Sequence, residues 1–146
     1  MARGDFTVFE EFADMLGMEL FDFDNDTFKM GLIDNTTPPT AADATPQWSD
    51  YSANEVGTGG NYTANGETVP VTWEEADGVA TLNDDSGDIS LAQDGSGFTD
   101  AYWGIFYDSD SGYAIGFLDL DGPVSEQDGP VTITFDASGI LTITVT

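Results

Sequence analysis

The sequence contains no cysteine and no histidine. The lack of cysteine excludes disulfide bonds, thiol nucleophiles and metal sites built on thiolates. The lack of histidine excludes a Ser-His-Asp triad, a histidine general base and the usual zinc centres. Among 28 Asp and Glu side chains, carboxyl pairs arise by chance, so a glycosidase-type pair has no support in the sequence. We therefore predict no catalytic residues, no enzymatic activity and no bound cofactor.

Basic residues are nearly absent as well. Arg3 and Lys29 are the two basic residues among 146, and the formal net charge is −26. Such a surface repels the phosphates of DNA and RNA, which predicts that the chain binds no nucleic acid. Two interpretations of the acidity stay open: adaptation to a saline environment, and attraction to a basic partner surface. No apolar run approaches a length of about 18 residues, so no membrane span is predicted.

Residues 99–120 carry the strongest strand pattern of the chain. Two apolar runs, 101–107 and 113–120, flank the turn-forming residues 108–112. Successive side chains of a strand point to opposite faces, and in both runs each face is largely apolar. This pattern predicts a β-hairpin at the centre of a sheet that is covered on both faces, as in a sandwich or small barrel.

Shorter strand patterns are separated by connections rich in Asp, Gly and Ser. They cover residues 27–33, 68–73, 78–82 and 88–92, followed by 131–135 and 141–145, which we expect to form a last hairpin. Pro70 cannot donate to a ladder, so its strand is expected at a sheet edge. The sequence predicts one mostly β domain over residues 1–146, an antiparallel β-sandwich or jelly-roll-like fold whose strand-rich core spans 67–146.

The N-terminal segment, residues 1–22, has the pattern of an amphipathic helix. Thr7 and Glu10 match a capping box, and apolar residues recur after them at helical spacing. The pattern predicts a helix of about three turns. Two roles stay open: the helix covers one end of the sheet, or it docks on a partner through Phe6 and Phe9.

Residues 34–66 form a long stretch with little regular pattern. It is rich in Asn, Thr, Pro, Ala, Asp and Gly but includes Trp48, Tyr51 and Tyr62. Disordered segments are poor in aromatic residues, so we expect a long ordered loop. The three aromatic side chains are candidates for a binding interface. Internal packing, a contact between subunits and a ligand contact stay open as their roles.

The acids of the central hairpin are the closest approach to a metal constellation. Asp108, Asp110 and Asp119 occupy three oxygen-ligand positions of a calcium loop. However, Gly112 stands at a ligand position, Tyr113 stands where the loop needs glycine, and Asp119 lies in an expected strand. We therefore interpret these acids as a solvated hairpin tip that binds divalent cations at most adventitiously.

The order of segments resembles that of the capsid decoration, or cement, proteins of tailed bacteriophages. The resemblance covers nearly the whole chain and rests on the N-terminal helical segment followed by residues 24–33, 48–66, 101–108, 114–120 and 131–144. Its most specific pieces are the sequence SANEV at 52–56 and the sequence FDASGIL at 135–141. The family carries a more balanced mixture of Lys and Asp, and the acidity of this chain resembles adaptation to a saline habitat and a marine host.

The resemblance implies a β-sandwich or jelly-roll subunit on the outer surface of a virion. It further implies a homotrimer that bridges neighbouring copies of the major capsid protein. Such a structural role needs no catalytic group and no membrane. The alternative function is a carbohydrate-binding or fibre-type β-sandwich module of a virion, since exposed Trp and Tyr side chains can stack on sugars.

Overall fold

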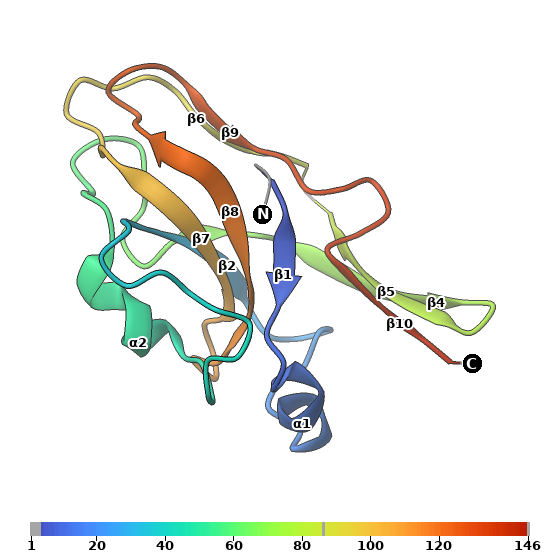
Figure 1. Ribbon diagram of the computed structural model, residues 1–146. Coiled ribbons are helices and arrows are strands. Elements are labelled where there is room, and N and C mark those ends of the chain that lie inside the picture. Colours follow the sequence, from blue (N-terminus) through green and yellow to red (C-terminus); the bar gives the residue numbers. More distant parts are fainter. Residues whose placement is uncertain (1–3, 86, 146) are drawn as a thin grey trace.

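The computed structural model describes residues 4–85 and 87–145 and consists mainly of antiparallel sheets. The largest sheet has five strands (Figure 1). Their order is β1 (Phe6–Val8), β8 (Ala114–Val124), β7 (Ala101–Asp108), β2 (Phe28–Ile33) and β3 (Glu67–Thr68). The mostly β, sandwich-like fold predicted from the sequence is confirmed.

Two smaller sheets pack against one face of the five-stranded sheet (Figure 1). One has the strand order β10 (Leu141–Thr144), β5 (Val79–Asp84) and β4 (Val71–Ala76). The other pairs β6 (Ile89–Leu91) with β9 (Val131–Ile133). The predicted strand 68–73 is divided at Pro70: Thr68 ends β3 of the five-stranded sheet, and Val71 begins β4 of the three-stranded sheet. Both strands lie at sheet edges, as predicted for the strand that contains Pro70.

The β7–β8 hairpin lies at the centre of the structure, as the sequence predicted. β7 is the middle strand of the five-stranded sheet, between β8 and β2. Phe106 belongs to the main core between the layers, whereas Ile105 and Tyr107 belong to a second core on the opposite face. All three side chains are nearly or fully inaccessible to solvent. The expectation that this strand is covered on both faces is therefore confirmed.

The long segment 34–66 covers the second face of the five-stranded sheet. It is ordered and contains α2 (Trp48–Tyr51) and the 3-10 helix η1 (Ser52–Asn54). Trp48 and Tyr51 pack there with Phe9 and Phe117. Gly31 of β2 makes room for this packing, because a Cβ atom at that position would lie 2.4 Å from the Trp48 ring. The segment thus covers a sheet face that in a two-sheet sandwich would ordinarily be exposed to solvent.

The predicted start of the N-terminal helix at Thr7 is wrong. Phe6–Val8 forms strand β1, which pairs with β8, and the helix α1 spans only Phe12–Gly17. No side-chain cap is present at its N-cap residue, Glu11. The ladder to β8 satisfies the backbone groups that a first helical turn would have used, and this outweighs the local capping signal. The short helix packs Phe12 and Met15 into the main core at one end of the sandwich.

The expected C-terminal hairpin is also wrong. β9 pairs with β6, and β10 pairs with β5, so the two strands belong to different sheets. The turn before β10 instead docks on β5: Ile140 N–H donates to the Leu82 carbonyl at 2.7 Å, and Gly139 takes a φ of +103° beside Thr81. As a result β9 and β10 are edge strands of the two small sheets. β1 is an edge strand of the five-stranded sheet.

Candidate functional site

The candidate metal centre is a cluster of three acids at the tip of the β7–β8 hairpin. Asp108 ends β7, Asp110 lies in the turn, and Asp26 lies in the loop that leads into β2. One carboxylate oxygen from each lies within 4.8 Å of the others. The antiparallel register, which places Phe28 opposite Asp108, brings the loop before β2 to the hairpin tip. Oxygen ligands of this kind suit Ca²⁺ or Mg²⁺.

Hydrogen bonds within the chain occupy these carboxylates. Asp108 is fully buried and accepts hydrogen bonds from the Asp110 N–H at 2.8 Å and the Ser111 hydroxyl at 2.6 Å. Asp110 accepts from the Thr27 N–H at 2.6 Å, and Asp26 accepts from the Asp22 N–H at 2.8 Å. The bond from the Thr27 N–H to Asp110 fixes the hairpin tip to the loop before β2, and the other bonds order each of the two segments, so the cluster has a structural role in its own right.

Burial raises the pKa of the Asp108 carboxyl above its ordinary value, and the neighbouring Asp26 carboxyl raises it further. The hydrogen bonds from Ser111 and the Asp110 N–H act in the opposite direction. This arrangement favours the protonated form of Asp108, because its ionised form is both desolvated and repelled by the adjacent Asp26 carboxylate.

Asp119 does not belong to this cluster, which corrects the grouping predicted from the sequence. It lies on β8 opposite Trp103, near the other end of the hairpin. Its carboxylate accepts a hydrogen bond from the Asp121 N–H at 2.7 Å. The calcium-loop spacing wrongly predicted that Asp119 lies near Asp108. β8 runs away from the turn, whereas the last residue of a calcium loop folds back to bind the ion. The residue that joins the cluster, Asp26, has no sequence signal linking it to Asp108.

The aromatic interface candidates lie mostly inside the chain. Phe9, Trp48, Tyr51 and Tyr62 have exposed fractions of 2, 8, 3 and 2%, and only Phe6 is half-buried. Their burial favours internal packing as their role, because these side chains already contact other residues of the same chain.

The two tyrosines are also held by hydrogen bonds. The Tyr51 hydroxyl donates to Asp43 at 2.7 Å, and the Tyr62 hydroxyl donates to Glu55 at 2.9 Å while accepting from the Leu32 N–H at 2.9 Å. Burial raises the pKa of both phenols above their ordinary value. The bonds to Asp43 and Glu55 hold parts of segment 34–66 to one another, and the bond from the Leu32 N–H to the Tyr62 hydroxyl joins the segment to β2.

A shallow hollow of about 440 Å³ lies beside Trp48, lined among others by Lys29, Gln47 and Tyr107. Lys29 is the only basic residue in the described part of the chain. One lysine cannot reverse the field of a molecule with a net charge of −26, so the hollow does not favour an anionic ligand.

Glu126 is a buried acid that the sequence did not reveal. Its side chain is fully buried, and Oε1 accepts a hydrogen bond from the Asn61 N–H at 2.7 Å. Oε2 has no hydrogen-bond partner among the described residues. Gly60 and Gly97 provide the space around it, since a Cβ atom at Gly97 would lie 2.4 Å from Oε2. In the sequence Glu126 stands in a run typical of a turn, which gave no indication of burial.

No family model, no curated protein and no solved structure matches the chain. Among the described residues, no helix is long and apolar enough to cross a membrane. The fold and the surface define an acidic, mostly β, sandwich-like domain.

Proposed function

We propose that this chain is a non-enzymatic structural protein that binds the outer surface of a phage head and bridges copies of the major capsid protein. The observation that carries the proposal is the combination of a rigid core, filled on both faces of one sheet, with a net charge of −26. A rigid acidic domain adheres to a basic protein surface through complementary charge. The resemblance of the segment order to capsid decoration proteins gives the class of partner.

The energetic contribution of such a protein follows from mass action. A domain that binds the assembled shell, and not its separated subunits, stabilises the shell by an amount that grows with its free concentration. In a homotrimer, each trimer would contact several capsid subunits at once, and the linked contacts would raise the overall affinity. The role requires a rigid surface and no reactive group.

The acid cluster does not favour hydrolysis. Carboxyl pairs of glycosidases flank a substrate cleft, whereas the Asp108 carboxyl is fully buried and hydrogen-bonded within the hairpin tip. The three aromatic candidates do not favour the carbohydrate-binding alternative, because Trp48, Tyr51 and Tyr62 are buried and cannot stack on a sugar.

The test is co-sedimentation of the purified chain with heads of the phage that encodes it, after the bound copies have been stripped with salt. We expect the chain to rebind at low NaCl and to be released at high NaCl, and the refilled heads to withstand a higher temperature than stripped heads. Analytical ultracentrifugation of the free chain tests the trimer. Heads that never contain the chain, or that fail to rebind it at low salt, would contradict the proposal.

A further inference from the structure

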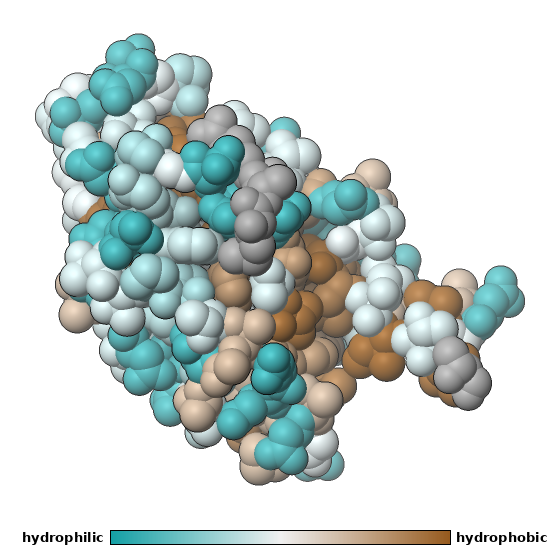
Figure 2. All heavy atoms as spheres, in the orientation of Figure 1, coloured by the Kyte–Doolittle hydropathy of each residue, from teal (hydrophilic) through white to brown (hydrophobic). Residues whose placement is uncertain are grey.

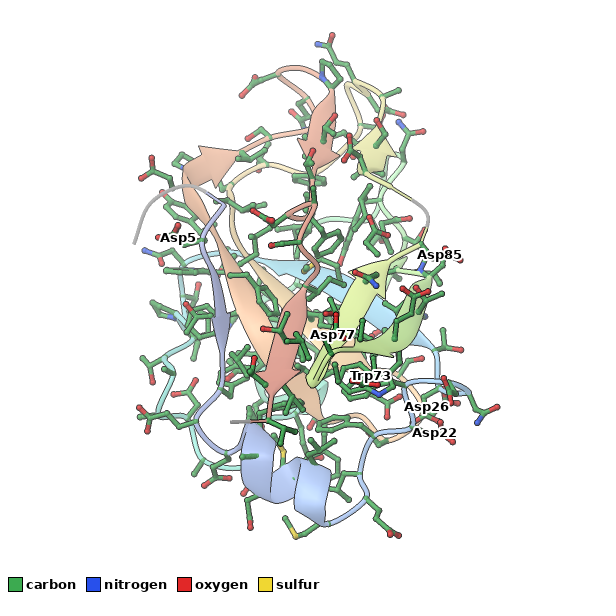
Figure 3. All side chains as sticks on the ribbon, turned by 90° about the vertical axis from the view of Figure 1, so that its right-hand side faces the viewer. Asp5, Asp22, Asp26, Trp73, Asp77 and Asp85 are labelled. Atoms are coloured by element: carbon green, nitrogen blue, oxygen red, sulfur yellow. The ribbon has the colours of Figure 1, made fainter. Side chains whose placement is uncertain are left out.

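One flank of the sandwich carries three edge strands. β1 is the last strand of the five-stranded sheet, while β9 and β10 are the last strands of the two small sheets. In Figure 3 the small sheets face the viewer; β1 lies along the left margin of the layer behind them, and β9 and β10 are the strands of the small sheets nearer to that margin. The layers are therefore not joined by a strand along this flank in the described part of the chain.

A groove runs between the layers along this flank. One part, of about 240 Å³, lies between β8 and β9, and a second part, of about 270 Å³, lies between β1 and residues 134–140. Leu118 and Thr134 line both parts. Apolar side chains, including Ile133, Phe135 and Ile140, also line the groove. The space-filling view shows hydrophobic side chains gathered in the recess between β1 and β10 (Figure 2).

The backbone of β1 has hydrogen-bonding groups that point away from β8, to the outer edge of the five-stranded sheet. Along its inner edge the Asp119 N–H donates to the Asp5 carbonyl, and the Phe9 N–H donates to the Ile115 carbonyl. In an antiparallel ladder the residues alternate, so Phe6 and Val8 direct their N–H and C=O groups to the outer edge. The next outward group is already used, since the Glu10 N–H donates to the Ala41 carbonyl. Within residues 4–85 and 87–145 no backbone group pairs with Phe6 or Val8 on that outer side, so the two residues form a short edge at which another strand can pair.

The charge of the molecule limits what can occupy the groove. Asp5 and Asp136 line it, and Asp5 lies beside the start of β1 (Figure 3). Pairing of this flank with the same flank of a second copy would bring two sets of Asp5 and Asp136 together, which like-charge repulsion opposes at this contact. A segment that carries Lys or Arg would be attracted by the same field.

We propose that this groove binds an extended segment of a partner protein in which apolar residues alternate with Lys or Arg. The segment adds a strand to the outer edge of β1 and places its apolar side chains against Thr134 and Phe135. Its basic side chains then point to the opposite face of the sheet, the face of Asp5. The inference deepens the proposed function, on which it rests for the identity of the partner, and assigns the contact to one flank.

The first experiment uses a designed peptide of about seven residues that alternates valine with lysine, the length of a typical strand. Its matched control replaces each lysine with glutamate. We expect the lysine peptide to bind the full chain, with an affinity that falls at least about tenfold between 50 and 500 mM NaCl, as charge screening requires. The amide protons of Phe6 and Val8 should exchange more slowly when the peptide is bound. Equal binding of both peptides, or unchanged exchange at both amides, would overturn the inference.

A pair of surface variants tests the location. Thr134→Trp fills the groove from an exposed position that lines both of its parts. Thr142→Trp makes the same exchange at an exposed position of β10 that lines neither part. We expect Thr134→Trp to weaken peptide binding at least about tenfold and Thr142→Trp to leave it within about twofold, as expected when one of two substitutions removes a hot-spot contact. Circular dichroism would verify that both variants fold.

The same variants separate this inference from the proposed function. If Thr134→Trp loses the peptide but the native chain does not bind phage heads, the groove stands and the capsid proposal fails. If the native chain and Thr134→Trp bind heads equally well, the capsid proposal stands and the groove is not the contact. If the native chain forms dimers in which Phe6 and Val8 are already protected without peptide, a second copy occupies the groove and the inference is wrong.

Discussion

Replacing Gly31 with alanine should destabilise the protein through a single steric conflict. The added Cβ atom would lie 2.4 Å from two atoms of the Trp48 ring and 3.1 Å from a third. Carbon atoms in contact are ordinarily about 3.5–4.0 Å apart, so the ring would have to move by about 1 Å. β2 cannot retreat, because it is paired with β7 on one side and with β3 on the other.

The structure also gives the size of the effect. Trp48 stacks on Tyr107 with ring centroids 5.0 Å apart, and its Nε1 donates to Asn65 at 3.3 Å. Overpacking a core costs about 1–3 kcal/mol, and a disturbed aromatic pair adds about 0.5–1.5 kcal/mol. We therefore expect Gly31→Ala to lower the free energy of unfolding by about 2–4 kcal/mol, measured by urea denaturation followed by circular dichroism.

A double-mutant cycle isolates the contact with Trp48. Trp48→Leu removes the ring atoms that the new methyl group would meet, so Gly31→Ala in that background should be within about 1 kcal/mol of neutral. Gly17→Ala is the matched control, since no heavy atom lies within 4 Å of a Cβ atom at that position. Equal losses from Gly31→Ala in both backgrounds would refute the reasoning, and so would no loss in the native background.

The remaining predictions concern charge. Screening of the net charge of −26 should raise the melting temperature of the free chain by several degrees between low and molar NaCl, with KCl acting equally; a flat response would contradict this. Asp108→Asn should raise the free energy of unfolding at pH 7 by about 1 kcal/mol, since an amide can donate to the Asp26 carboxylate. Because the pKa of Asp108 is raised above 3.8 in the folded state, the native chain loses stability as pH rises from that value through the raised pKa. The advantage of the variant in pH-dependent urea titrations should therefore disappear below about pH 4, whereas exposed Asp88→Asn should show no such trend.

Features fixed by neighbouring residues could be predicted from the sequence. The β7–β8 hairpin is one, because its turn lies between two runs whose alternation sets both faces. The ordered state of segment 34–66 is another, since Trp48 and Tyr51 provide apolar surface that a disordered segment lacks.

Features that depend on the choice of partner strand could not be predicted. The alternation of residues 131–135 and 141–145 is satisfied by any neighbour with one apolar face, so it does not distinguish a local hairpin from pairing with β5 and β6. The same holds for the acid cluster, because Asp26 reaches Asp108 only through the β2–β7 register. A helix does follow Thr7, but it begins only at Phe12, because the edge of β8 offers Phe6–Val8 a set of ladder hydrogen bonds.

The acidic surface affects what can pair with the edge strands of the open flank. Edge strands such as β1 and β9 expose backbone groups that can pair with any other edge, which makes a neutral protein prone to self-association. A net charge of −26 on every copy opposes that encounter at a range set by the ionic strength. In the contact that we propose, the same charge draws in a basic segment, so the sign of the charge decides which strand can reach the edge. Under that proposal the acidity of the surface serves specificity.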